Sequence, residues 1–291
     1  MAKIVITGGT GLVGKRLTEL LLLKNHEVVI LTRNPKEKNE YKWNLATNYI
    51  DEKVFVNLDY IIHLAGAGIA EKKWTAKRKE EIISSRVAST MLLLAKVKEH
   101  KTPLKKFISA SATGFYGAVT LDTIFTEEDK PGTDFLGEVC TQWENAAHEF
   151  KKENIAVTIL RTGIVLSENG GALEKMRTPI VSPLGSGKQH IPWIHIDDLC
   201  QTYINALDDN LNGIYNAVAP EHHTSASFSK LLAKSIHRPF IPFGVPAFLL
   251  KSIFGQMAII LLEGSRISSK KIEKSGYSFQ FKTLKKALEN L

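Results

Sequence analysis

The chain has 291 residues, of which 44% are hydrophobic and 23% are charged. These fractions are those of a soluble globular protein, and no segment is long and apolar enough to span a bilayer. The formal net charge of +8 comes from scattered basic residues without interleaved aromatic residues. We therefore expect a small-molecule substrate and no nucleic-acid or membrane partner.

Cysteine usage indicates the compartment. Cys140 and Cys200 are the two cysteines, and their separation does not match the spacing of metal ligands. Reduced thiols fit a reducing environment. A strand begins as early as Lys3, which leaves no room for a signal peptide. The sequence therefore predicts a cytoplasmic protein without a metal site.

The first elements in chain order are a buried strand at 4–7 and an amphipathic helix at 15–24, with Gly8, Gly11 and Gly14 between them. Gly8 permits the tight turn, Gly11 lets backbone amides approach a pyrophosphate, and Gly14 lets the helix pack close to the strand. The N-terminus of the helix offers free N–H groups and a partial positive charge. This order of strand, glycine turn and helix predicts a dinucleotide-binding site.

The second strand, at 28–32, indicates which dinucleotide is bound. NAD-preferring sites place an acidic residue near the end of this strand, where it binds the ribose hydroxyls. This chain has Arg33 there, preceded by Thr32. A guanidinium binds a 2′-phosphate with two hydrogen bonds and stacks on adenine, and Thr32 adds a hydroxyl. The sequence therefore predicts NADP(H) as the cofactor.

Strands and helices continue to alternate through the first half of the chain. Further strands are expected at 60–64, 106–109 and 157–161, and helices at 75–99 and 137–153. Repeated strand–helix–strand order predicts an α/β fold in which a Rossmann-like, doubly wound parallel sheet is covered on both faces. The crossover connections should be right-handed.

The second half of the chain differs in composition, because glycine and proline are frequent in the region 170–192, which indicates loops. Three further helices are expected, at 197–207, 227–236 and 245–262. We expect an NADP-binding Rossmann domain at 1–165, followed by a smaller C-terminal substrate lobe and C-terminal domain at 166–291. The ligand crevice should lie between them, outside the carboxyl ends of the strands.

Several segments together resemble the extended (atypical) short-chain dehydrogenase/reductase superfamily. They are GGTGLVG at 8–14, LTRNP at 31–35, HLAGAGI at 63–69, ISASATGFYG at 108–117, LRTGIVL at 160–166 and PWIHIDDL at 192–199. With GSGKQ at 185–189, the chain looks more narrowly like the epimerase-like branch of the "epimerase family protein" type, which has its own C-terminal domain. The resemblance implies an NADP(H)-binding oxidoreductase or epimerase.

The resemblance also implies which residues contact the cofactor. These are Gly8, Gly11, Leu12, Val13, Gly14, Thr32, Arg33, Leu64, Ala65, Gly66, Glu81, Arg86 and Val165. Glu81 and Arg86 are five residues apart on a helix and point to different sides of it. A solvated charged helix face is the alternative interpretation of these two. Val165 would close over the nicotinamide half.

Catalysis in this superfamily uses a Ser or Thr together with a Tyr-x-x-x-Lys pair, in which Lys lowers the pKa of Tyr and binds the nicotinamide ribose. Ser111 fits the Ser position, and Ser109 is the second candidate. The Tyr-x-x-x-Lys pair is missing. When Glu144 sets the register, Leu136 stands at the Tyr position and Cys140 at the Lys position.

A register shifted by one residue gives Phe135 and Val139, which also lack a proton donor. Tyr116 is the nearest phenol and is a candidate catalytic residue, although the Tyr of a YG pair usually lines the pocket. His195 and Asp197 are further candidates, with structural hydrogen bonding and helix capping as their alternatives.

Two hypotheses follow. The first is an NADP(H)-dependent oxidoreductase, or a nucleotide-sugar-epimerase-like enzyme, that acts on an unidentified small carbonyl or hydroxyl compound held by Ser111. The second is a catalytically silent NADP(H)-binding sensor or scaffold protein. The missing Tyr and Lys favour the second, whereas Ser111 and the elaborate loops at 166–195 favour a real pocket. A homodimer paired through the helices after the third and fourth strands is a further hypothesis.

Overall fold

Within residues 1–207 and 211–291, which the computed structural model describes, eight strands form one sheet in the order β11-β8-β6-β5-β1-β2-β3-β4. Every neighbouring pair is parallel except β3 with β4. The strands are β1 (Lys3–Thr7), β2 (Glu27–Thr32), β3 (Glu40–Asn44), β4 (Tyr49–Ile50), β5 (Tyr60–His63), β6 (Lys106–Ala112), β8 (Ala156–Thr162) and β11 (Gly213–Ala217). The doubly wound parallel sheet is confirmed, and its strand order reverses between β1 and β5, where such folds bind ligands.

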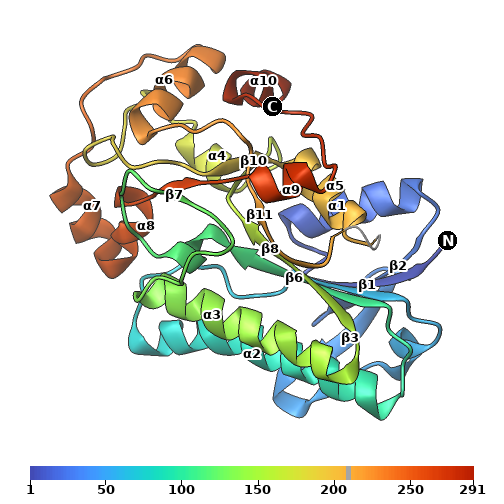
Figure 1. Cartoon of the computed structure of the whole chain (residues 1–291). Coiled ribbons are helices and arrows are strands. Elements are labelled where there is room, and N and C mark those ends of the chain that lie inside the picture. Colours follow the sequence, from blue (N-terminus) through green and yellow to red (C-terminus); the bar gives the residue numbers. More distant parts are fainter. Residues whose placement is uncertain (208–210) are drawn as a thin grey trace.

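Four helices cover the two faces of the sheet (Figure 1). Helices α1 (Leu12–Leu23) and α5 (Ile196–Asn205) pack together on one face, and α2 (Ala76–Glu99) and α3 (Phe135–His148) pack together on the other. Helix α1 begins three residues before the predicted start, because the glycine turn is short and Gly11 is already its N-cap.

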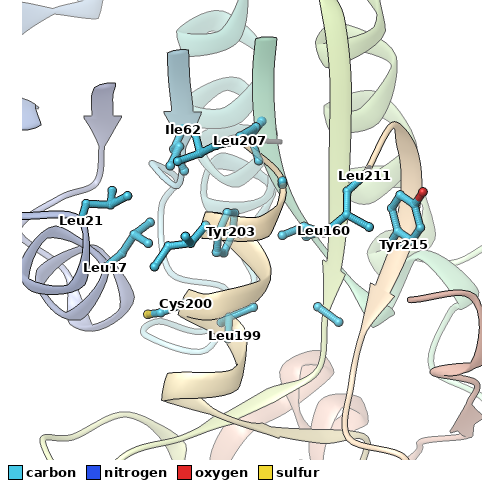
Figure 2. Close-up of a cluster of buried hydrophobic side chains, with 14 of the residues drawn as sticks. Leu17, Leu21, Ile62, Leu160, Leu199, Cys200, Tyr203, Leu207, Leu211 and Tyr215 are labelled. Carbon is cyan, nitrogen blue, oxygen red and sulfur yellow. The ribbon is translucent and has the colours of Figure 1, made fainter. Parts of the chain in front are cut away.

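The apolar run of β1 supplies both cores, because successive side chains of a strand point to opposite faces. Ile4 and Ile6 belong to the core under α1 and α5, and Val5 belongs to the core under α2 and α3. Figure 2 shows the first core, in which Leu17 of α1 lies opposite Tyr203 of α5. Because both faces of β1 are buried, its sequence is a continuous run of hydrophobic residues and does not alternate with polar ones.

The C-terminal half contributes to both lobes. Strand β11 and helix α5 come from this half and complete the main sheet and its helical cover. The division at residue 165 is therefore not a division of the sheet. A separate hydrophobic cluster joins α6 (Ser225–Ser235) to α10 (Leu284–Asn290), with Trp193 fully buried in it.

Short elements complete this smaller lobe. They are β7 (Ile124–Phe125), which pairs with β12 (Arg266–Ile267), β9 (Ile164–Leu166), which pairs with β10 (Trp193–His195), α4 (Ala172–Met176), α7 (Ala247–Phe254), α8 (Ile259–Leu262) and α9 (Lys270–Lys274). The single helix expected at 245–262 is wrong. Gly255, at φ +59°, ends α7, and a 3₁₀ turn precedes α8. Among the described residues, no helix has the length and apolarity to cross a membrane.

Candidate functional site

A cavity of about 490 Å³ lies at the carboxyl ends of β1, β2 and β5. Most of the predicted cofactor residues line it, namely Gly8, Gly11, Thr32, Arg33, Leu64, Ala65, Gly66 and Glu81. Trp43, Asn44 and Leu45 form the wall that follows β3. The structure therefore gathers five separate segments of the sequence into one site at the point where the strand order reverses.

The glycine turn has little room for side chains. Gly8 adopts φ +71°, and a Cβ on it would lie 3.0 Å from the backbone nitrogen of Ala65. A Cβ on Gly14 would lie 2.5 Å from the Cα of Gly9, closer than real atoms approach. A Cβ on Gly11 would meet only the Gly8 carbonyl oxygen, at 3.3 Å. The turn therefore keeps its backbone at the surface of the cavity.

The charges around this cavity suit an anion. The first turn of α1 contains no acidic residue, so the partial positive charge of its N-terminus is not neutralised locally. Arg33 is exposed and forms no ion pair with any described residue. Glu81 is bound to Arg78, with 2.8 Å between its carboxylate and the guanidinium. These features fit a dinucleotide carrying an additional phosphate at the Arg33 end.

Five predicted cofactor residues do not line this cavity, and two of them are Gly14, which is buried in α1, and Arg86, which lies on α2. Leu12 lines an adjoining cavity of about 590 Å³, which shares Thr10 with the first. Val13 packs against the core under α1. Val165 lies in β9, where it pairs with Ile194 of β10 and packs against the same core. Their contribution to cofactor binding remains a prediction.

A second pocket, of about 310 Å³, opens beyond the carboxyl ends of β6 and β8. One face of α3 forms a wall, through Leu136, Val139, Cys140 and Trp143. Residues from the loops of the smaller lobe, including Leu184 and Ile191, form the opposite wall. The pocket is thus enclosed by both lobes, as the sequence predicts for the ligand crevice.

The face of α3 shows which register applies. Val139 and Cys140 both line this pocket, so the registers differ at the Tyr position, where Leu136 lines the pocket and Phe135 does not but packs edge-on against Trp74 at 4.8 Å. The positions that would carry Tyr and Lys are therefore occupied by an aliphatic side chain and a thiol. Burial raises the pKa of Cys140 to about 12, so this thiol is neutral near pH 7 and is a poor nucleophile.

Ser111 is placed differently from the sequence expectation. Its side chain is 3% exposed and is absent from the pocket lining, and its Oγ donates a hydrogen bond to Oε1 of Glu144 at 2.7 Å. Ser109 is fully buried and donates to the carbonyl of Ala110. Thr113, two residues after Ser111, lines the pocket, and its hydroxyl forms no hydrogen bond with a described residue. A hydroxyl is thus available at the pocket, but it belongs to Thr113.

Glu144 and Arg161 form a buried ion pair beneath the pocket. Arg161 donates to both carboxylate oxygens of Glu144, each at 2.8 Å, and its Nη1 donates to the hydroxyl of Tyr116 at 3.1 Å. The Tyr116 hydroxyl in turn donates to Oδ1 of Asn216 at 2.7 Å. Burial raises the pKa of Tyr116 to about 12. Tyr116 lines the pocket, yet its hydroxyl already has an acceptor and a donor.

His195 and Asp197 lie away from this pocket. Nδ1 of His195 accepts a hydrogen bond from the backbone N–H of Asp197 at 3.1 Å, and the ring stacks on Phe281 at 3.8 Å. His195 therefore caps α5. The carboxylate of Asp197 pairs with Arg16 at 2.7 Å. His195 therefore has the structural hydrogen-bonding role that was its alternative, whereas Asp197 does not cap α5 and forms an ion pair instead.

Arg86 lies apart from Glu81, on the side of α2 that faces the 310 Å³ pocket. Its Nη1 donates to the carbonyl oxygen of Ala67 at 3.0 Å, and Ala67 lines the nucleotide cavity. The two cavities are therefore separated by one loop, the HLAGAGI segment. The expectation that Glu81 and Arg86 point to different sides is confirmed.

Comparisons with known proteins agree with this geometry. Residues 4–217 match the NAD dependent epimerase/dehydratase family, and residues 245–291 match a domain of unknown function, DUF1731. An epimerase family protein of Staphylococcus aureus is 36% identical over 300 residues, which cover 100% of this chain and 99% of that protein.

Two solved structures are also similar. The human epimerase family protein SDR39U1 (isoform 2), solved with NADPH, superposes with a TM-score of 0.90 at 30% identity, over 99% of this chain and 98% of that one. The nucleoside-diphosphate sugar epimerase of Corynebacterium glutamicum has a TM-score of 0.80 at 31% identity, over 99% of this chain and 57% of that one.

Proposed function

Because the chain belongs to the NAD dependent epimerase/dehydratase family, we propose that it is an NADP(H)-dependent oxidoreductase of a small carbonyl or hydroxyl compound. One observation carries the proposal. A cavity built for a dinucleotide lies one loop away from an enclosed pocket of about 310 Å³, and both stand at the carboxyl edge of the sheet. This is the arrangement in which the reactive end of a cofactor meets a small substrate.

The residues present fit NADP(H). The backbone around Gly8 and Gly14 leaves no space for side chains, and the N-terminus of α1 faces the cavity with its first-turn amides. Arg33 is free to bind the 2′-phosphate. The structure of the human relative, at 30% identity, was solved with NADPH.

The pocket supplies binding and the exclusion of water. When bound, the nicotinamide supplies or accepts a hydride. Leu136, Val139 and Trp143 provide an apolar wall that strengthens polar interactions inside the pocket. The hydroxyl of Thr113 is positioned to hold the reacting oxygen, and the proton comes from water, since Tyr116 is already engaged by Arg161 and Asn216.

A catalytically silent NADP(H)-binding sensor or scaffold is the second candidate. Leu136 and Cys140 stand where the superfamily has its proton-transfer pair, and this observation favours it. A pocket that has lost its chemistry would still bind the cofactor and could report on it through a partner.

The proposal includes a cytoplasmic location. A reducing compartment suits Cys140 and Cys200, which are both buried and form no disulfide.

The proposal also includes a homodimer, in which two chains would pair through the outer surfaces of α2 and α3. Light scattering after size-exclusion chromatography tests the pairing, and a mass equal to one chain would contradict it.

Turnover distinguishes the two candidate functions. The protein loaded with NADPH is mixed with aldehydes, ketones and quinones, and the loss of nicotinamide absorbance is followed. We expect at least one carbonyl to be reduced, and Thr113→Val to lower kcat/KM by about 10- to 100-fold, the value of one hydrogen bond to developing charge. Ser111→Ala is the matched comparison. A larger loss of kcat in Ser111→Ala than in Thr113→Val would return the role to Ser111, and tight binding without any turnover would favour the sensor.

A further inference from the structure

The pocket beside α3 is small for what the proposed function places in it. Its volume is about 310 Å³, whereas ligand pockets in proteins have volumes of about 300–1,000 Å³. In the proposed function, the nicotinamide end of the cofactor enters this same pocket and meets the reacting oxygen near Thr113. Little volume then remains, so the rest of a larger substrate must lie outside the pocket.

A larger cavity of about 700 Å³, which we call the outer cavity, adjoins this pocket. Leu136, near the start of α3, and Glu263, directly after α8, line both spaces. Helix α8 contacts both as well, since Leu261 lines the pocket and Leu262 lines the outer cavity. A ligand that is held in the pocket and extends past Leu136 therefore enters the outer cavity.

Apolar side chains form most of the surface of the outer cavity. They come from the start of α3, from α7 and from the segment that includes α8, and they are Phe135, Leu136, Ala247, Ala258, Ile259 and Leu262. Helix α7 also presents Phe248 and Ile253 to solvent, with 70% and 56% of each residue exposed. The wall of the outer cavity therefore belongs to a helix that is apolar on its exposed side too.

The two carboxylates of this lining and one of its two lysines already have partners. Asp134 accepts hydrogen bonds from two backbone N–H groups, at 3.0 and 2.6 Å. Glu263 accepts one from the hydroxyl of Thr120 at 2.5 Å. Nζ of Lys79 lies 4.9 Å from the centre of the Phe135 ring, within the range of a cation–π contact. These groups therefore do not need a polar ligand to satisfy them.

The charges of the lining do not favour an anion. Among the lining residues that the structure describes, Lys79 and Lys251 are balanced by Asp134 and Glu263. The diphosphate of a nucleotide-linked substrate carries at least two negative charges, which must be paired when they leave water. A lining without net charge does not provide that pairing, whereas its apolar side chains suit a hydrocarbon.

We propose that the outer cavity binds an aliphatic tail of the substrate, so that the protein acts on a carbonyl compound, or the corresponding alcohol, with a long hydrocarbon chain. The inference rests on the proposed function and names its substrate class. The polar head lies in the pocket near Thr113, and the tail passes Leu136 toward Ile259 and Leu262. Removing the tail from water supplies binding free energy in proportion to its length.

A series of methyl ketones tests the proposal without turnover. The protein is saturated with NADP⁺, which has no hydride to donate, and is titrated with 2-butanone, 2-hexanone, 2-octanone and 2-decanone. Dissociation constants are measured by saturation-transfer NMR. We expect the affinity to rise by about two- to fourfold with each added methylene, the range from half-buried to fully buried.

A charge placed in the outer cavity should affect only the long ketones. Ile259 is partly buried and lines this cavity. We expect Ile259→Glu to weaken the binding of 2-decanone by about tenfold or more, the value of about two buried methylenes, and to change that of 2-butanone by less than about twofold. The matched control is Ile253→Glu, at an exposed residue of α7 that lines neither space, and it should change neither affinity.

The wild type alone can overturn the proposal. An affinity that does not rise beyond 2-butanone does so, even if Ile259→Glu fails to fold. Equal losses for the short and the long ketone in Ile259→Glu also overturn it. So does UDP that competes with 2-decanone and not with 2-butanone, because a diphosphate would then occupy the outer cavity. If affinity rises along the series but the NADPH-loaded protein reduces none of the ketones, the tail site stands and the proposed function fails.

Discussion

Replacing Glu144 by Gln tests the buried ion pair beneath the pocket. Glu144 is 4% exposed and Arg161 is 2% exposed, and two hydrogen bonds of 2.8 Å join them. Glutamine has nearly the same shape, so the substitution removes the charge and leaves an uncompensated guanidinium in the interior. Breaking a buried pair in this way costs about 3–5 kcal/mol.

That loss is a large share of the stability of the chain. Native domains are stable by about 5–15 kcal/mol, and at this chain length each kcal/mol lowers Tm by about 2 °C. We therefore expect Glu144→Gln to lower Tm by about 6–10 °C in thermal unfolding followed by circular dichroism. The surface pair of Lys98 and Glu153 provides the control, since its side chains are 55% and 34% exposed. Glu153→Gln should cost less than about 1 kcal/mol.

A double variant separates charge from shape. If the isolated charge is the cause, the double variant Arg161→Met with Glu144→Leu should lose less stability than Arg161→Met and Glu144→Leu lose together when each is made alone, because no charge remains buried in the double variant. A Glu144→Gln protein that melts within about 2 °C of the wild type would refute the reasoning, and so would strict additivity in the double variant.

Three further outcomes are expected. Gly14→Ala should lower both Tm and NADPH affinity, because its Cβ would lie 2.5 Å from the Cα of Gly9; unchanged values of both would show that the turn can relax. Burial lowers the pKa of His63 from 6.5 to about 3. As the pH falls below 6.5, the imidazole is therefore protonated in the unfolded state but not in the folded state, and the free energy of unfolding decreases. Urea unfolding should show about 2 kcal/mol less stability at pH 5 than at pH 7 from this group, and His63→Gln should flatten that dependence. Burial raises the pKa of Cys140 and Cys200 to about 12 each, so neither should react with iodoacetamide at pH 8 before the protein unfolds, as followed by mass spectrometry.

The nucleotide site could be predicted from the sequence because its signals are local. The glycine turn lies between one strand and one helix, and Arg33 follows directly on β2. By contrast, β3 has the sequence EYKWN and is not among the predicted strands, since a strand with only one buried residue, next to the short edge strand β4, shows no hydrophobic run. The break of the last long helix at Gly255 needed a positive φ that the sequence does not reveal.

The substrate pocket could be predicted only in part, because its polar contacts cross between elements. Whether Ser111 or Thr113 faces the pocket depends on Glu144, which is thirty-three residues away from Ser111 and attracts its hydroxyl. The surroundings of Arg86 depend on the packing of α2 against α3. Motif spacing places these residues on their helices and strands, but the packing decides which group each of them meets.

The central claim is that this chain recognises NADP(H) through Arg33, and competitive titration with NADPH and NADH tests it most directly. We expect NADPH to bind at least about tenfold more tightly than NADH, and Arg33→Glu to remove that preference while leaving NADH binding nearly unchanged, since one charge-assisted contact is worth about 1.5–3 kcal/mol. Arg238→Glu makes the same change at an exposed arginine outside the nucleotide cavity and should have no effect. Equal affinity for the two nucleotides, or an Arg33→Glu protein that still prefers NADPH, would contradict the account.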